Sequence, residues 1–300
     1  MKHLINCLFL LSLCAAFCSC KKDFGNLNSP TIESFLNNAS KSDLNNLVTG
    51  SESGQRTSLA FYLDDVSTIG RELYHFSASE PRYVTDLLGA EAATLSNSNF
   101  YIATPWASAY RVIKNCNLLI QAASQSTLIS DPEKAGYAGF ARTIKAYQLL
   151  LNLNLTDSNG IRLEVTDPDH PGPVVSYTQA LSGIMSLLDS AKNDFSNAVI
   201  DFPLSSGFSG FNDAAGLTKF NRALAARVAA YQGQWTDVLT ALNESFFGLD
   251  KPFSLGVYHV FGTGTGDQLN PVFIPQNQTG DVRVAHPSYA ADILPGDDRI

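Results

Sequence analysis

The sequence has little cysteine and little charge, and both shortages exclude classes of protein. Of its five cysteines only Cys116 lies beyond position 20, which excludes a framework of disulfide bonds. Charged residues make up 16% of the chain, against about 25% in an average soluble domain. The net charge is −8, and no basic run is longer than Lys21-Lys22. The chain therefore lacks the clustered positive charge that neutralises nucleic-acid phosphates.

The sequence also lacks the common catalytic and metal-binding motifs. It contains no His-Glu-x-x-His zinc motif and no Gly-x-Ser-x-Gly nucleophile elbow. Beyond His3 the histidines are scattered, and no pair has helical i, i+4 spacing. No motif implies calcium or another cofactor. We therefore expect no metal site, no cofactor and no catalytic residues, and binding becomes the leading class of function.

One set of carboxylates leaves a hydrolase open as an alternative. Asp64-Asp65 with Glu72 has the residue types of a glycosidase acid pair. Adjacent residues on a helix do not face each other, however, so the sequence favours a solvated helix face over a catalytic pair. We therefore predict that the protein is not an enzyme.

The first nineteen residues are typical of a signal peptide. Lys2 and His3 precede a largely apolar stretch, 4–17, which is shorter than the ~20 residues of a membrane span. Small residues stand at the two positions before Cys20, as in a bacterial lipobox. We predict that residues 1–19 are removed and that Cys20 is lipidated; the alternative is ordinary secretory cleavage near Ser19. Multiple acyl chains on one cysteine anchor a protein stably to a membrane.

The remaining chain is mostly helical in its apolar periodicity. Residues 20–32 form a turn-rich tether after the anchor, and 33–300 form one helical domain, predicted to be truncated at its C-terminus. Helices are expected over 32–48 and 59–69, and further helices are expected to begin at five signals. These signals are Thr104-Pro105, Asp131-Pro132, the capping box Ser176 with Gln179, Thr218, and Trp235 after Gly233.

The pairing of these helices predicts the fold class. The helices on either side of Gly233 carry small alanines where they would cross, which is typical of a tetratricopeptide hairpin. Short alternating or extended runs, over 161–165, 255–261, 272–274 and 282–284, predict a few short strands. The expected fold is mainly α, with tetratricopeptide-like helical hairpins in an αα superhelix, long loops and a few short strands.

Aromatic residues outside the helical stripes are the candidates for ligand binding. Cys116, Trp106 and Trp235 lie on periodic helices and are predicted to pack in the core. The segment 70–104 has no clear period and is interpreted as loops and short helices. Aromatic rings stack on sugar faces and arginine donates hydrogen bonds to hydroxyls, although each such residue can equally be structural. The candidate ligand-binding residues are Arg71, Tyr74, Arg82, Tyr83 and Tyr101.

The order of several motifs resembles the SusD/RagB family of Bacteroidetes outer-membrane lipoproteins. The resemblance runs from Cys20 to the last residue, and it rests on the order of the motifs, since none is decisive alone. The motifs are Cys20 with Lys21-Lys22-Asp23, the segment 26–31 (NLNSPT), the helical segments 105–120, 141–147 and 220–235, and Asp297-Asp298-Arg299, where Asp298 replaces the family's proline.

The resemblance implies a location, a partner and a ligand. A member of this family is a lipid-anchored protein of the cell outer membrane, facing the exterior, with a fold of tetratricopeptide-like pairs. It captures glycan, such as a starch-like or other oligosaccharide, and delivers it to a TonB-dependent, SusC-like outer-membrane transporter. Two alternatives stay open: a peptide-binding member of the same family, and a helical-repeat adaptor without a small ligand. Nothing in the sequence names the ligand.

Overall fold

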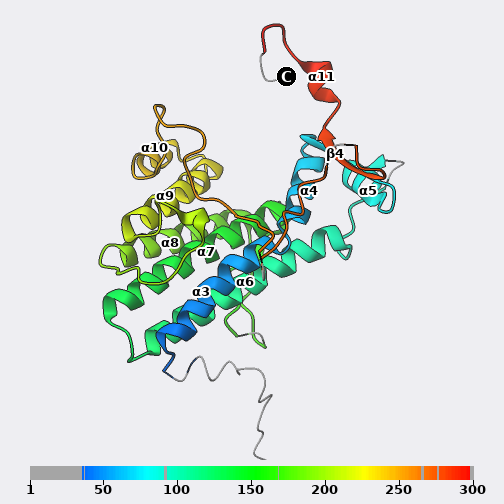
Figure 1. Ribbon diagram of the computed structural model, residues 1–300. Helices are drawn as coiled ribbons and strands as arrows, with labels where there is room; N and C mark the ends of the chain where they lie inside the picture. The colour runs from blue at the N-terminus through cyan, green and yellow to red at the C-terminus, as the bar shows by residue number, and fades with distance from the viewer. Residues whose placement is uncertain are drawn as a thin grey trace, which may run out of the picture.

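The computed structural model describes residues 36, 38–90, 93–167, 169–264, 267–275 and 277–297 (Figure 1). The predicted signal peptide, the anchor at Cys20 and the tether 20–32 lie outside these residues, as do Asp298 and Arg299. The fold is mainly helical, as the sequence predicts, with two small antiparallel sheets in the described part.

A stack of antiparallel helical hairpins forms most of the molecule (Figure 1). Each helix packs against the next one along the chain, so the stack grows in sequence order from α6 to α10, and α3 packs on the outer side of α6. Its helices are α3 (Lys41–Arg56), α6 (Phe100–Gln125), α7 (Asp131–Thr156), α8 (Tyr177–Phe195), α9 (Ala214–Tyr231) and α10 (Trp235–Asn243).

Side-chain caps fix the beginnings of three of these helices. Ser40, Ser130 and Ser176 each accept a hydrogen bond from the backbone N–H three residues on, while the side chain at that position bonds back to the serine. These reciprocal bonds satisfy amides that a helix otherwise leaves free. The predicted starts at Asp131 and at the Ser176–Gln179 box are confirmed. The helix expected over 32–48 is shifted, because Ser40 is the N-cap of α3, which runs on to Arg56.

Two predicted helix starts are wrong by a turn. α6 begins at Phe100, so Pro105 lies inside the helix. Pro105 removes the N–H that would bond to the Tyr101 carbonyl, and its ring crowds that carbonyl; the helix nevertheless continues through it. α9 begins at Ala214 instead of Thr218, because the Asp213 carboxylate accepts from the Gly216 N–H at 2.7 Å.

The α9–α10 hairpin turns where the sequence predicts it. Gly233 has φ +71°, a left-handed conformation that glycine adopts without strain, and α10 starts two residues later at Trp235. The predicted core positions of the two tryptophans are wrong. Trp235 is 68% exposed and Trp106 is 39% exposed. Cys116 is fully buried, as predicted.

A smaller corner of the molecule combines helices with a β-ribbon. It contains α4 (Leu59–Ile69), β1 (Leu73–Ser77) and α5 (Arg82–Leu88), and β4 (Asp281–Ala285) returns to it from the far end of the chain (Figure 1). β1 and β4 pair antiparallel, with Leu73 opposite Ala285 and Ser77 opposite Asp281. The bounds of α4 and the predicted run 282–284 agree with the sequence analysis, whereas strand β1 does not appear in it.

The remaining extended segments are short. β2 (Ile161–Arg162) pairs with β3 (Val174–Val175), a smaller strand than the predicted 161–165. The described residues of 244–280 form no strand, so the runs predicted over 255–261 and 272–274 are wrong. The chain there crosses the helices from α10 back to β4, and short α11 (Ser288–Asp292) follows it. None of the helices in the described part is both long and apolar enough to span a membrane.

Candidate functional site

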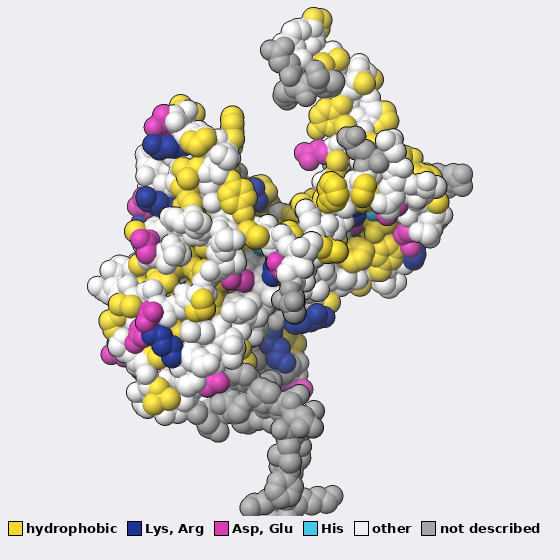
Figure 2. Space-filling view, viewed as in Figure 1, with side chains coloured by type: hydrophobic (Ala, Val, Ile, Leu, Met, Phe, Trp, Pro, Cys, Tyr) yellow, Lys and Arg dark blue, Asp and Glu magenta, His cyan; other side chains and the backbone are white. Residues whose placement is uncertain are grey.

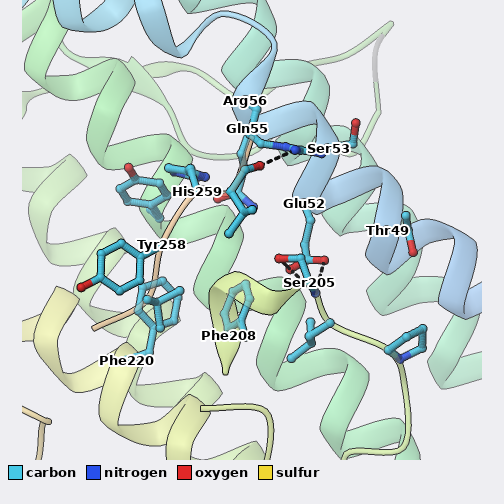
Figure 3. Close-up of a pocket in the computed structure, with 15 residues that line it drawn as sticks. Thr49, Glu52, Ser53, Gln55, Arg56, Ser205, Phe208, Phe220, Tyr258 and His259 are labelled. Carbon is cyan, nitrogen blue, oxygen red and sulfur yellow. Dashed lines mark hydrogen bonds between the residues drawn. The ribbon is translucent and has the colours of Figure 1, made fainter. Parts of the chain in front are cut away.

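A partly open cavity lies between α3 and the long C-terminal segment (Figure 3). It has a volume of about 440 Å³, within the range of small-molecule sites. Five parts of the chain line it: one face of α3, Tyr147 on α7, Phe220 on α9, and the segments 203–208 and 257–260.

The polar wall of the cavity is a face of α3. Thr49, Glu52, Ser53 and Arg56 recur at helical spacing of three and four, so their side chains lie along one side of the helix. The opposite side of α3 carries Leu44, Leu47 and Val48, which are buried in the core that α6 and α7 share. Burial of that apolar stripe turns the polar side chains towards the cavity.

The aromatic wall comes from segments that are distant in sequence. The rings of Tyr147 and His259 lie stacked, with centroids 6.2 Å apart and planes at 28°. Phe208 and Phe220 meet edge to face at 5.8 Å. Burial lowers the pKa of His259, assisted by the positive charge of Arg56, so the imidazole stays neutral at neutral pH.

A glycine allows the two loop segments to approach closely. The Tyr258 N–H donates to the Gly207 carbonyl at 3.0 Å, which joins the segment 203–208 to 257–260. A Cβ atom at position 207 would lie 2.0 Å from the Tyr258 carbonyl oxygen. Only glycine therefore fits this contact, and the contact holds the aromatic wall opposite α3.

Two charged side chains of α3 have different partners. The Arg56 guanidinium donates to the Val260 carbonyl and, at 2.7 Å, to the Asp267 carboxylate. The Glu52 carboxylate accepts hydrogen bonds from the N–H and the hydroxyl of Ser205, both at 3.1 Å. Burial raises the pKa of Glu52, and the two bonds from Ser205 partly oppose that shift.

The arrangement suits non-covalent binding of a small polar ligand. It combines aromatic rings with a carboxylate and hydroxyl groups, the mixture that recognises molecules with both apolar faces and hydrogen-bonding groups. Among the described residues, no group of three or more histidine, cysteine, aspartate or glutamate side chains could hold a metal ion.

Solved structures identify the fold. No protein-family model and no curated protein sequence matches the chain. B. fragilis NanU matches over 82% of this chain and 49% of its own, with 17% identity and a TM-score of 0.53. The chain has a SusD-like fold.

Two further structures match less well. A SusD-like protein of Bacteroides fragilis covers 71% of this chain at 16% identity and a TM-score of 0.49, and surface glycan-binding protein A of Bacteroides thetaiotaomicron covers 70% at 14% identity and the same score. The chain spans 39% and 42% of those two structures, so it spans less than half the length of each of these three proteins.

The SusD-like fold places two of the predicted ligand-binding tyrosines in a small core. Tyr83 is 7% exposed and stacks on His75, with ring centroids 4.0 Å apart. Tyr101 is fully buried, and its hydroxyl donates to the Asp86 carboxylate at 2.7 Å. Both rings therefore have structural partners, the alternative that the sequence left open.

The other three candidates also lie away from the cavity. Arg82 pairs with Glu80 at 2.6 Å and lies over the Phe100 ring at 4.8 Å. Tyr74 is half-buried on β1, and Arg71 is exposed after α4 with φ +59°. None of the five lines the cavity, and a ligand-binding role for them stays a prediction.

No sequence pattern singles out the residues that line the cavity. Tyr147 lies on an apolar helical stripe, which predicts a core position. Glu52 lies among polar residues, and no motif near it indicates binding. His259 lies more than a hundred residues beyond Tyr147 in the sequence. The one usable signal was the phenylalanine-, serine- and glycine-rich segment 204–216, whose phenylalanines are unusual for a loop.

Two adjacent aspartates, Asp64 and Asp65, are buried in the smaller corner of the fold. The interpretation of Asp64-Asp65 as a solvated helix face is wrong, since their side chains are 2% and 0% exposed. The reason is the returning strand: Arg283 on β4 donates to both oxygens of Asp64, at 2.6 and 2.7 Å. Glu72 is exposed and separate from this pair, so the three do not form an acid set.

Proposed function

We propose that this protein is a lipid-anchored member of the SusD/RagB family that captures an oligosaccharide in the cavity beside α3. The SusD-like fold supports the family, and the cavity supports the ligand class. One of the matched structures is named as a surface glycan-binding protein. Catalysis is not part of the proposal, because no set of acids in the described cavity is placed as a pair.

The location and the partner are further parts of the proposal. The lipobox at Cys20 supports an anchor in the outer membrane, and the charged residues that follow it support an exterior position. Delivery to a TonB-dependent, SusC-like transporter follows from the resemblance. A captured sugar that stayed at the surface would be of no use to the cell, which fits a transporter as the recipient.

The single observation that carries the proposal is the two-sided lining of the cavity. Its aromatic wall offers flat apolar faces of the kind that pack on sugar rings, and its α3 wall offers hydroxyl and carboxylate groups for the sugar hydroxyls. Sugars present both kinds of surface on every ring.

A glycan array with three tyrosine variants tests this function. Tyr258 lines the cavity and is 51% exposed, so Tyr258→Ala should fold normally and weaken glycan binding by about tenfold, equivalent to ~1.4 kcal/mol of lost contact. Tyr289 is 47% exposed away from the cavity, and Tyr289→Ala is the matched control. Loss of binding in Tyr74→Ala but not in Tyr258→Ala would move the site to the segment 70–104.

An adaptor role is the second candidate, and one observation favours it. The outer side of α10 and the segment after it carry large apolar side chains that are exposed in the described structure. Those side chains are Trp235, Leu239, Phe247, Leu249 and Phe253. Figure 2 shows hydrophobic side chains gathered over the α10 end of the molecule, and exposed apolar surface is typical of a protein contact. A blank glycan and peptide array, together with transporter capture that Trp235→Ser abolishes, would favour this role.

A further inference from the structure

The charges around the cavity do not balance, and the imbalance points to a class of ligand. The ionisable side chains that line it, apart from two tyrosines, are Glu52, Arg56 and His259. Arg56 is already neutralised by Asp267, with which it forms an ion pair at 2.7 Å. His259 is kept neutral by burial, which lowers its pKa. The negative charge of Glu52 is therefore the one left over in the described lining.

Glu52 accepts hydrogen bonds but has no ion-pair partner in the described structure, and the positive charge of Arg56 acts on it only as a minor influence that lowers its pKa. Its oxygens accept only from Ser205 in the described structure, and no basic side chain lies within ion-pair distance. An ionised carboxylate offers about four acceptor positions, so some of its lone pairs are free for a ligand. Because burial raises the pKa of Glu52, a positive charge in the cavity would stabilise its ionised form.

The wall opposite Glu52 also suits a cation. Figure 3 shows Glu52 and Ser205 on one side of the cavity and Phe220 and His259 on the other, with Phe208 between them. The faces of aromatic rings attract cations within about 6 Å, through their quadrupole moment. A carboxylate facing aromatic rings is a common setting for a bound ammonium group.

We infer that the cavity selects a sugar with a free, protonated amino group, and that Glu52 binds this group. The inference rests on the proposed function of the cavity, and it adds a ligand class, amino sugars, which the fold does not specify. The amine would donate to Glu52, while the sugar ring would pack on the aromatic wall. A neutral sugar would leave Glu52 without an ion-pair partner.

A pair of oligosaccharides that differ only at nitrogen tests this inference. Glucosamine oligomers and their N-acetylated counterparts are titrated into the purified full chain by calorimetry, in mildly acidic buffer where the free amines are protonated. The free-amine oligomer should bind about tenfold more tightly, the contribution of one charge-assisted hydrogen bond. The preference should disappear in Glu52→Gln, which keeps the shape of the side chain, and should weaken as salt is added.

Control variants separate the effect of Glu52 from general charge and from misfolding. Asp237→Asn removes one negative charge from exposed α10, away from the cavity, and should keep the tenfold preference. Thermal unfolding of Glu52→Gln shows whether the variant is folded. If Glu52→Gln lost binding of both oligomers equally, Glu52 would be a general hydrogen-bonding residue, and the inference would be overturned.

The remaining outcomes distinguish the inference from the function on which it rests. Equal binding of the two oligomers, weakened by Tyr258→Ala, would overturn the amine preference and leave glycan capture standing. If neither oligomer bound but another glycan on the array did, the amine preference would likewise be overturned and glycan capture would stand. Binding of a lysine peptide that depends on Glu52, without binding of either oligomer, would overturn both in favour of peptide capture.

Discussion

Two regions of the molecule hold acids away from water, and they differ in what compensates the charge. In the smaller corner, Asp64 is bound on both oxygens by Arg283 and lies 3.3 Å from His75. At the cavity, Glu52 is bound only by Ser205, and its charge faces an open space. The first acid has an ion-pair partner within the fold, whereas the second has none in the described structure.

This difference separates a structural acid from a binding one. Burial alone would raise the pKa of Asp64, but the hydrogen bonds from Arg283 and the nearby His75 ring together outweigh burial and hold that pKa below its ordinary value. At Glu52 burial is the larger effect, and the pKa rises. The sign of the shift therefore reports whether the protein itself supplies the partner.

The largest expected effect is on the Asp64–Arg283 pair. Asp64→Ala leaves Arg283, whose side chain is 12% exposed, without its main partner. Removing one member of a buried pair costs about 3–5 kcal/mol of unfolding free energy, because the other charge stays desolvated. Urea unfolding followed by circular dichroism measures this loss. The double variant Asp64→Ala with Arg283→Met should recover part of it.

If Asp64→Ala cost less than about 1 kcal/mol, the pair would behave as a surface ion pair. In that case the contrast with Glu52 would fail, since neither acid would depend on its partner. Glycan binding should be unchanged in both variants, because the corner does not line the cavity.

The second expected effect concerns Asp65, which lies in the same corner but has no hydrogen-bond partner for either oxygen in the described structure. Burial, with the nearby charge of Asp64, raises its pKa from 3.8 to about 8. The folded state thus holds the proton more tightly than the unfolded one. Its contribution to stability is complete below about pH 4 and is lost as the pH rises to about 8.

The variant Asp65→Asn should remove this pH dependence. We expect it to be more stable than the wild type near pH 8, by an amount on the order of a few kcal/mol, and similar to it near pH 4. Unfolding free energies measured across this range provide the test. The Asp64 contribution does not interfere, because its pKa is lowered and its loss occurs at pH values below about 4. Parallel curves for the two proteins would refute the assignment to Asp65.

The sequence predicts the helical stack better than the corner or the cavity. Local signals suffice for a helix: Ser176 with Gln179 starts α8, and Gly233 ends α9, without help from distant residues. The burial of Asp64 depends on Arg283, which is 219 residues away and is brought there by the pairing of β1 with β4. Local periodicity carries no information about such a contact.

The cavity could not be predicted from the sequence either, because its lining residues are distant from one another in the chain. Glu52 faces residues of the segments 203–208 and 257–260, and neither segment has a periodic pattern that places it over α3. Aromatic residues without helical periodicity predict a ligand site in the segment 70–104, but Tyr83 and Tyr101 form a small core there. An aromatic residue in an aperiodic segment therefore indicates burial as readily as binding.

The smallest expected effect is on the partner of Glu52. Ser205→Ala removes the hydroxyl bond at 3.1 Å but keeps the backbone N–H bond, so stability should fall by at most about 1 kcal/mol. Because that hydroxyl stabilises the ionised form, the pKa of Glu52 should rise further, and carbon-detected NMR of labelled glutamate measures its titration. Ser205→Thr keeps the hydroxyl and should restore the wild-type midpoint of the Glu52 titration.

The same titration of Glu52 distinguishes an amine ligand from a neutral sugar. An amine ligand should lower the midpoint in the wild type and in both Ser205 variants, since a cation favours the carboxylate, whereas a neutral sugar should lower it much less. A midpoint that no ligand moves would show that Glu52, like Asp64, is completed by the fold.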